Sequence, residues 1–252
     1  MKIKKKKIII TGGSGRFGSY IKKFPTNHKI FFPTKNELDI LSMKKITKYL
    51  NSKKPDVIIH LAGLSRPMNI HDTNIVKSID LNIIGTANIT KACSTKNIKL
   101  IYFSTNYVYP GIKGNYDEKN PLLPVNNYAW SKLGGEASVK LYKNPLILRV
   151  CMTEKPFIHK KAFANVKTNF IYHDEVVPIL FNLLDQRGTI NIGGKGQSIF
   201  KFAKKYNKNL KKSFLSKKKN IGIPFNSTMK LKKMISVINK KKNIYEGKKF
   251  KN

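Results

Sequence analysis

Short apolar runs alternate with amphipathic stretches through the first 150 residues of this 252-residue chain. The apolar runs end at glycine, proline or polar residues, which is typical of strands, whereas the stretches between them repeat apolar residues three and four positions apart, as helices do. Strands are predicted over residues 6–11, 29–32, 56–62, 99–104 and 146–150. Helices are predicted over residues 15–24, 43–53, 75–93 and 128–142.

The alternation of strands with helices predicts an α/β fold, a doubly wound parallel sheet with helices on both faces. We expect residues 1–150 to form this domain. The later chain has shorter strands, over 170–172 and 189–192, and a basic end, so we expect residues 151–252 to form a small substrate-binding lobe. Ligands of such sheets bind at the carboxyl ends of the strands.

A glycine-rich turn joins the first predicted strand to the first helix. Its sequence is TGGSGRFG, with glycines at Gly12, Gly15 and Gly18. In this arrangement the first glycine allows a tight turn, the second lets the backbone approach a diphosphate, and the third lets helix and strand pack closely. The helix N-terminus then attracts the anion. The turn predicts an NAD(P)-binding Rossmann fold.

The choice between NADPH and NADH depends on the end of the second strand. A carboxylate there would bind a free ribose 2′-hydroxyl, but none precedes Glu37 and Asp39. Lys35 and Arg16 instead stand on the two flanking loops, where either cation could face a 2′-phosphate. We expect NADPH to be favoured, with NADH left open.

A tyrosine and a lysine, Tyr128 and Lys132, lie four residues apart on one face of a predicted helix. A nearby cation favours the phenolate and lowers the pKa of a tyrosine, so that it can exchange a proton with a carbonyl group. Ser104 and Thr105 end a predicted strand, where a hydroxyl could bond the same carbonyl oxygen.

Four motifs in order resemble the extended short-chain dehydrogenase/reductase superfamily. They are the glycine turn, HLAG at His60–Gly63, the segment LNIIGT around Asn82, and YAWSK from Tyr128 to Lys132. Within that branch the chain is most similar to dTDP-4-dehydrorhamnose reductases, through Leu38-Asp39-Ile40 and the run from Ser104 to Tyr109.

The resemblance implies specific roles. Tyr128 would be the proton donor, Lys132 would hold the nicotinamide ribose and lower the tyrosine pKa, and Thr105 would bond the carbonyl oxygen. Substrate contacts would come from Thr105, Asn106 and Tyr128, although Asn106 stands where the family has Asp. Cofactor contacts would come from Gly12, Ser14, Gly15, Arg16, Phe17, Gly18, Lys35, Asp39, Ile40, Leu61, Ala62, Gly63, Asn82, Phe103, Tyr128 and Lys132.

The implied reaction is hydride transfer from NAD(P)H to C4 of a nucleotide-linked 4-keto-6-deoxyhexose, in the synthesis of surface polysaccharide precursors. Related 4,6-dehydratases carry Asp-Glu after the catalytic threonine, and Asn106-Tyr107 here lack those acids. An NAD-dependent 4-epimerase uses the same Tyr and Lys and stays open. So does a non-catalytic NADP-binding subunit, like the regulatory subunit of methionine adenosyltransferase.

The formal net charge of +37 changes this picture little. Lysines are spread through the chain and no nucleic-acid-binding signature accompanies them, so we expect no specific nucleic-acid partner; the charge should steer anionic ligands such as nucleotide sugars.

No apolar run is long enough to span a membrane. The two cysteines and the histidines lack metal-ligand spacing. We expect a cytoplasmic protein without a metal, and the sequence leaves a homodimer open.

Overall fold

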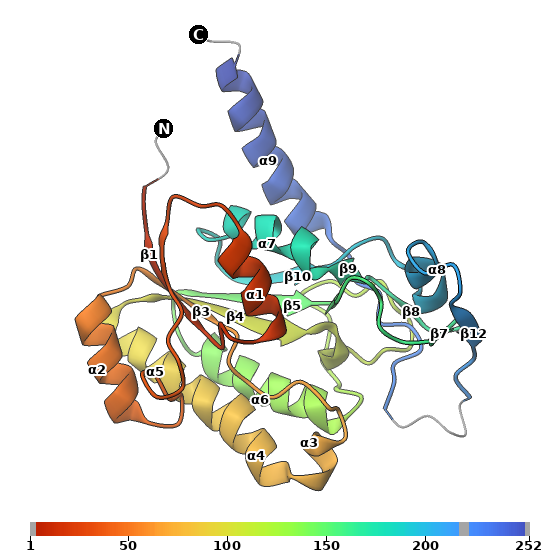
Figure 1. The fold of residues 1–252 in the computed structure, drawn as a ribbon, viewed down its shortest axis with the longest axis horizontal. Coiled ribbons are helices and arrows are strands. Elements are labelled where there is room, and N and C mark those ends of the chain that lie inside the picture. Colours follow the sequence, from red (N-terminus) through yellow and green to blue (C-terminus); the bar gives the residue numbers. More distant parts are fainter. Residues whose placement is uncertain (1–3, 217–221, 250–252) are drawn as a thin grey trace.

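A computed structural model describes residues 4–216 and 222–249, with side chains described up to residue 241. Its centre is a six-stranded sheet in the order β10-β5-β4-β3-β1-β2, with every neighbouring pair parallel (Figure 1). The strands of this sheet are β1 (Lys7–Thr11), β2 (Lys29–Phe31), β3 (Val57–His60), β4 (Lys99–Thr105), β5 (Pro145–Val150) and β10 (Gly188–Ile192). The strand order changes direction between β1 and β3, as in a doubly wound Rossmann sheet.

Helices cover both faces of the sheet (Figure 1). One face carries α1 (Arg16–Lys23), α7 (His173–Asn182) and α9 (Lys232–Lys249). The other face carries α2 (Met43–Lys53), α3 (Ile70–Thr73), α4 (Ile75–Ile79), α5 (Gly85–Lys96) and α6 (Asn127–Lys140). The predicted α/β fold is therefore confirmed.

The apolar run of β1 shows why both faces must be covered. Ile8, Ile9 and Ile10 are all fully buried. Ile8 and Ile10 pack into the core under α1 and α7, while Ile9 packs into the core under α2 and α5. Successive strand residues point to opposite faces, so an uninterrupted apolar run is stable only between two layers.

The predicted helix over residues 75–93 is interrupted. A π-helical turn, η1 (Asp80–Ile84), lies between α4 and α5, and Asn82 is buried within it. The periodicity of the apolar residues does not distinguish this turn from the helices on either side of it, nor does it reveal the hydrogen bonds of the Asn82 side chain to distant segments. Such turns inside helices are frequent at functional sites.

The chain after residue 150 divides between the sheet and a smaller lobe. β10 is an edge strand of the central sheet and α7 covers it, so these parts of residues 151–252 extend the first domain. The lobe has its own small core, which includes Phe157, Phe202 and Leu215. Its elements are β6 (Met152–Thr153), β7 (Lys161–Phe163), β8 (Lys167–Thr168), β9 (Ile171–Tyr172), β11 (Gln197–Ser198), α8 (Ile199–Lys204) and β12 (Lys211–Ser213). The domain division at residue 150 stays a prediction, although β10 and α7, which come later in the chain, belong to the layers of the central sheet.

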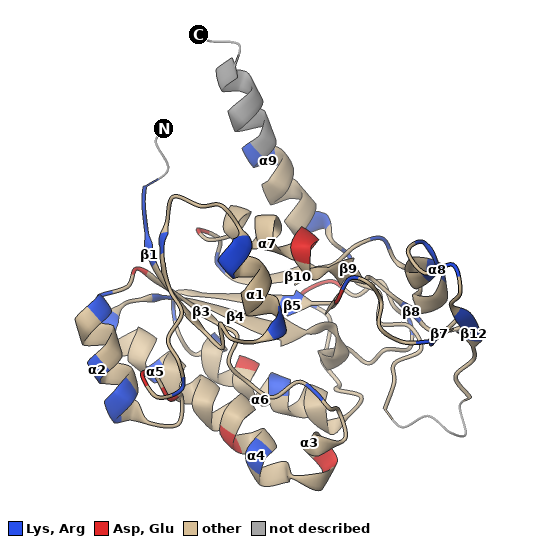
Figure 2. Cartoon of the chain, viewed as in Figure 1, with Lys and Arg blue, Asp and Glu red and all other residues tan. Residues whose placement is uncertain are grey.

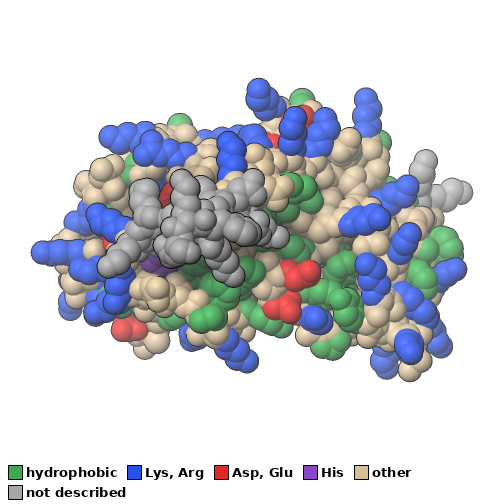
Figure 3. Space-filling model, turned by 90° about the horizontal axis from the view of Figure 1, so that it is seen from above, with side chains coloured by type: hydrophobic (Ala, Val, Ile, Leu, Met, Phe, Trp, Pro, Cys, Tyr) green, Lys and Arg blue, Asp and Glu red, His purple; other side chains and the backbone are tan. Residues whose placement is uncertain are grey.

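The basic residues are distributed over the molecule. Lys and Arg lie on helices and loops throughout the fold (Figure 2), and their side chains are spread over the face seen in Figure 3. No helix in the described part of the chain is both long and apolar enough to cross a bilayer.

Candidate active site

The glycine turn packs too closely for side chains. Gly12 has a φ of +69°, and a Cβ there would lie 2.6 Å from the Ala62 backbone nitrogen. A Cβ on Gly18 would lie 2.4 Å from the Gly13 carbonyl oxygen. Gly15 caps α1 without a side-chain hydrogen bond, and it is exposed together with its neighbours Ser14 and Arg16. The first-turn N–H groups of α1 are therefore open to an anionic ligand.

The end of β3 is fixed against the glycine turn. The Thr11 side chain accepts a hydrogen bond from the Ala62 backbone N–H and lies 2.7 Å from Nδ1 of His60, whose Nε2 is 3.1 Å from the Thr86 hydroxyl. Burial lowers the pKa of His60 to about 3, with Lys132 adding to the effect. His60 is therefore a neutral structural residue beneath the predicted cofactor contacts Leu61, Ala62 and Gly63.

Asn82 joins the predicted cofactor loop to the catalytic helix. Its Oδ1 accepts from the Leu64 N–H at 2.7 Å, and its Nδ2 donates to the Leu64 carbonyl at 2.9 Å and to the Ser131 hydroxyl at 2.8 Å. Ser131 lies on α6 directly before Lys132. The amide of Asn82 thus holds the Leu64 loop against α6, and its contact with the cofactor stays a prediction.

Thr105, Tyr128 and Lys132 are brought to one place by β4 and α6. Thr105 ends β4 and is buried, while Tyr128 and Lys132 are half-buried on successive turns of α6, which Asn126 caps at the Ala129 N–H. Burial raises the pKa of Tyr128 above its ordinary value, and a hydrogen bond with Thr105 and the charge of Arg66 offset part of that rise. The pKa of Tyr128 is thus raised in the free protein, where Lys132 was expected to lower it, and Tyr128 is protonated at neutral pH.

Lys132 lies in an environment that disfavours its charge. Its Nζ is 4.2 Å from the centre of the Tyr102 ring. Burial lowers the pKa of Lys132 to about 7, although the Glu136 carboxylate one turn along α6 opposes this effect. Its protonation is thus poised near neutral pH in the free protein.

A buried ion pair supports this helix, and sequence reasoning missed it. Glu136 and Arg149 are 0% and 1% exposed, with Oε1 and Nη2 2.5 Å apart. Glu136 also accepts from the Ser104 hydroxyl at 2.8 Å, and Arg149 donates to the Tyr109 hydroxyl at 2.8 Å. An arginine inside an apolar predicted strand is a signal for such a partner, since a buried charge must be paired.

The residues predicted at the adenosine end of the site differ in their burial. Lys35 is exposed beyond β2, Asp39 is half-buried, and Ile40 is buried with its side chain beside Gly85. Phe17 and Phe103 are buried with ring centroids 5.2 Å apart, so they shape the core beneath the glycine turn.

Arg16 is not brought to Lys35. Its guanidinium pairs with Glu154, 3.2 Å away, and contacts the Ser65 hydroxyl on the loop after β3, whereas Lys35 follows β2 on the other side of β1. In the free protein Arg16 is thus engaged by a long-range ion pair that local sequence does not reveal. Its sharing of a 2′-phosphate site with Lys35 stays a prediction.

Asn106 also lies differently from what its predicted substrate contact suggests. It is 3% exposed, and its Nδ2 donates to the Ser227 hydroxyl at 2.8 Å and to the Thr168 hydroxyl at 3.2 Å. These bonds fasten the end of β4 to the smaller lobe. The adjacent Tyr107 is half-buried, and burial raises the pKa of its hydroxyl above the ordinary value.

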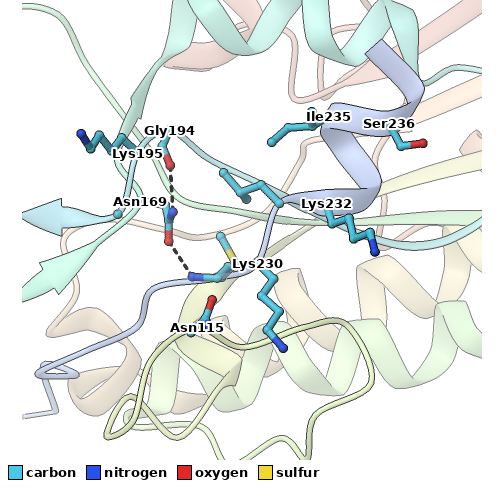
Figure 4. Close-up of a pocket in the computed structure, with 11 residues that line it drawn as sticks. Asn115, Asn169, Gly194, Lys195, Lys230, Lys232, Ile235 and Ser236 are labelled. Carbon is cyan, nitrogen blue, oxygen red and sulfur yellow. Dashed lines mark hydrogen bonds between the residues drawn. The ribbon is translucent and has the colours of Figure 1, made fainter. Parts of the chain in front are cut away.

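A separate hollow of about 610 Å³ lies beside α9 (Figure 4). There Asn169 donates to the Gly194 carbonyl and accepts from the Met229 N–H. Its lining includes none of the predicted site residues.

Within residues 4–216 and 222–249, no three His, Cys, Asp or Glu side chains gather as a metal ion would require.

Comparison with known proteins gives a consistent relationship. The family model "RmlD substrate binding domain" matches residues 6–169. A dTDP-D-glucose 4,6-dehydratase of Dictyostelium discoideum is 29% identical over 231 residues, which is 76% of this chain and 51% of the relative. Methionine adenosyltransferase 2 subunit beta of Xenopus tropicalis is 30% identical over 156 residues, which is 58% of this chain and 46% of the relative.

The chain spans about half the length of the curated relatives it matches. Among solved structures, a dTDP-4-dehydrorhamnose reductase from Bacillus anthracis in complex with NADP superposes with a TM-score of 0.80 at 24% identity, covering 90% of this chain and 91% of that one. This likeness shows the fold.

Proposed function

We propose that this chain, which belongs to the RmlD substrate binding domain family, is an NADPH-dependent reductase of a nucleotide-linked 4-keto-6-deoxyhexose. The observation that carries the proposal is the contact of Thr105, at the carboxyl end of β4, with Tyr128 on α6, with Lys132 one turn further along that helix and an open glycine turn in the same fold. Bound along that turn, NADPH or NADH would supply the hydride.

The side chains of this chain would then manage the proton and the carbonyl group. Tyr128, which is protonated at neutral pH, would donate its phenolic proton to the carbonyl oxygen. The Thr105 hydroxyl would hydrogen-bond the same oxygen and orient it. Lys132 would bind the ribose hydroxyls and, when charged, stabilise the phenolate that forms. The Tyr128 hydroxyl returns to its starting state on taking a proton from solvent.

The relative that is a 4,6-dehydratase raises a second reaction, elimination of water, which needs an acid and a base beside the sugar. The two residues directly after Thr105, Asn106 and Tyr107, have no carboxylate. The Asn106 side chain is hydrogen-bonded to Thr168 and Ser227. The nearby carboxylate Glu136 is fully buried in its pair with Arg149. This supports reduction over dehydration. A 4-epimerase would use the same Tyr128 and Lys132, and it would show no net oxidation of reduced cofactor.

The test is to follow the loss of reduced-nicotinamide absorbance with NADPH and NADH against a panel of nucleotide-linked 4-keto sugars, analysing the products by chromatography. The proposal expects cofactor oxidation matched by formation of the 4-alcohol. Interconversion of 4-epimers without cofactor oxidation would identify the epimerase instead.

A second candidate, a non-catalytic dinucleotide-binding subunit, is favoured by the similarity to methionine adenosyltransferase 2 subunit beta. It predicts NADP binding with no turnover of any keto sugar, together with co-purification with a methionine adenosyltransferase. In that case Tyr128→Phe would leave NADP binding and the co-purification unchanged.

A further inference from the structure

Two arginines and a glutamate meet beside the glycine turn. Arg66, on the loop after β3, donates from Nη1 to both carboxylate oxygens of Glu154 at 2.9 and 3.1 Å. Arg16, the first residue of α1, places Nε 3.2 Å from Oε1 of the same carboxylate. Glu154 follows β6, so this cluster ties the glycine turn and the β3 loop to the smaller lobe.

The cluster is built around its carboxylate. The Glu154 side chain is 16% exposed, whereas those of Arg16 and Arg66 are 51% and 37% exposed. Burial opposes ionisation, yet the backbone N–H, Arg66 and Arg16 together hold the pKa of Glu154 below its ordinary value. Two guanidinium groups facing one carboxylate leave a net positive charge at this point.

The location is where the cofactor diphosphate is expected. A glycine turn followed by a helix N-terminus binds that diphosphate through its N–H groups, and Gly15 leaves those groups without a side-chain cap. Arg16 belongs to the first turn of the same helix. The carboxylate of Glu154 is therefore an anion already held at this helix end.

Building on the cofactor site of the proposed function, we infer that Arg16 and Arg66 bind the cofactor diphosphate and that Glu154 takes its place in the free protein. A diphosphate carries two negative charges where Glu154 carries one, and guanidinium groups bind phosphate oxygens in paired hydrogen bonds. Cofactor binding then breaks the link from α1 and the β3 loop to Glu154. Glu154 acts as a competitor that lowers cofactor affinity and closes the empty site.

The experiment measures NADPH binding by isothermal titration calorimetry for the parent, Glu154→Gln, Arg66→Gln and the double variant, with folding checked by circular dichroism. Glu154→Gln should bind about fivefold more tightly, because the competing charge is gone. Arg66→Gln should bind about fivefold more weakly, and this penalty should persist in the Glu154→Gln background.

Asp174→Asn is the matched control. It removes one carboxylate charge nearby, but Asp174 faces Lys155 at 3.9 Å and makes no ion pair with Arg16 or Arg66. It should change the affinity by less than about twofold. ADP-ribose, which has the diphosphate but no nicotinamide, should follow the same order as NADPH across the variants.

Two results would overturn the inference while leaving the proposed function intact. One is that Glu154→Gln binds NADPH no more tightly than the parent. The other is that the Arg66→Gln penalty vanishes in the Glu154→Gln background, which would mean that Arg66 only neutralises Glu154. A parent protein that binds neither NADPH nor NADH would overturn the proposed function, and this inference with it.

Discussion

Replacing Arg149 with methionine should destabilise the protein severely, because it leaves the charged Glu136 carboxylate inside the core with the Ser104 hydroxyl and the half-exposed Lys140, 3.5 Å away, in place of its buried arginine partner. The side chains of Glu136 and Arg149 are almost fully buried. Removing one member of such a pair costs about 3–5 kcal/mol. For a chain of this size, each kcal/mol lowers the melting temperature by about 2–4 °C, so the expected loss is about 6–20 °C.

The assay is urea unfolding followed by circular dichroism, compared with a Glu136→Leu, Arg149→Met double variant. The double variant removes both charges, so it should be more stable than Arg149→Met alone. It should stay below the parent, since the Ser104 hydroxyl loses its acceptor and the Tyr109 hydroxyl keeps its bond to Asn191 but loses the one from Arg149. A loss below about 1 kcal/mol in Arg149→Met, or a double variant no more stable than that single variant, would refute the reasoning.

Three further predictions concern the site. Tyr128→Phe should reduce turnover by about 10²–10⁴-fold with cofactor affinity nearly unchanged, and near-parental turnover would contradict its role as proton donor. Because the pKa of Lys132 is about 7 in the free protein, kcat/KM should fall as pH rises through about 7 and the lysine loses its charge. Lys132→Arg should move that alkaline limb upward, since a guanidinium stays charged, and an unmoved limb would exclude Lys132 as its source. NADPH should bind about fivefold more tightly than NADH through Lys35, so Lys35→Ala should abolish the ratio in calorimetry, whereas Arg16→Ala should weaken both cofactors alike.

The elements of the sheet could be predicted because their apolar residues repeat locally. The run Ile8-Ile9-Ile10 needs two covered faces, and the predicted helix over 43–53 matches α2 at both ends. The position of Thr105 at a strand end, and of Tyr128 and Lys132 on one helix face, could also be predicted. The carboxyl end of a strand and the spacing on a helix are local properties.

The missed features depend on contacts between distant residues. Arg16 is paired with Glu154, 138 positions away along the chain, so its direction could not be read from the glycine turn. Asn106 bonds to Ser227 in the same way. Helix periodicity likewise does not reveal the π turn around Asn82 or the bonds of its side chain to Leu64 and Ser131.

The reductase assignment is best tested by mixing the purified protein with NADPH and a nucleotide-linked 4-keto-6-deoxyhexose, beside its Tyr128→Phe variant. We expect the parent to consume reduced cofactor and form an equal amount of the 4-alcohol, while the variant binds NADPH but turns over at least about 100-fold more slowly. Cofactor binding by the parent without consumption, against every sugar of the panel, would contradict it.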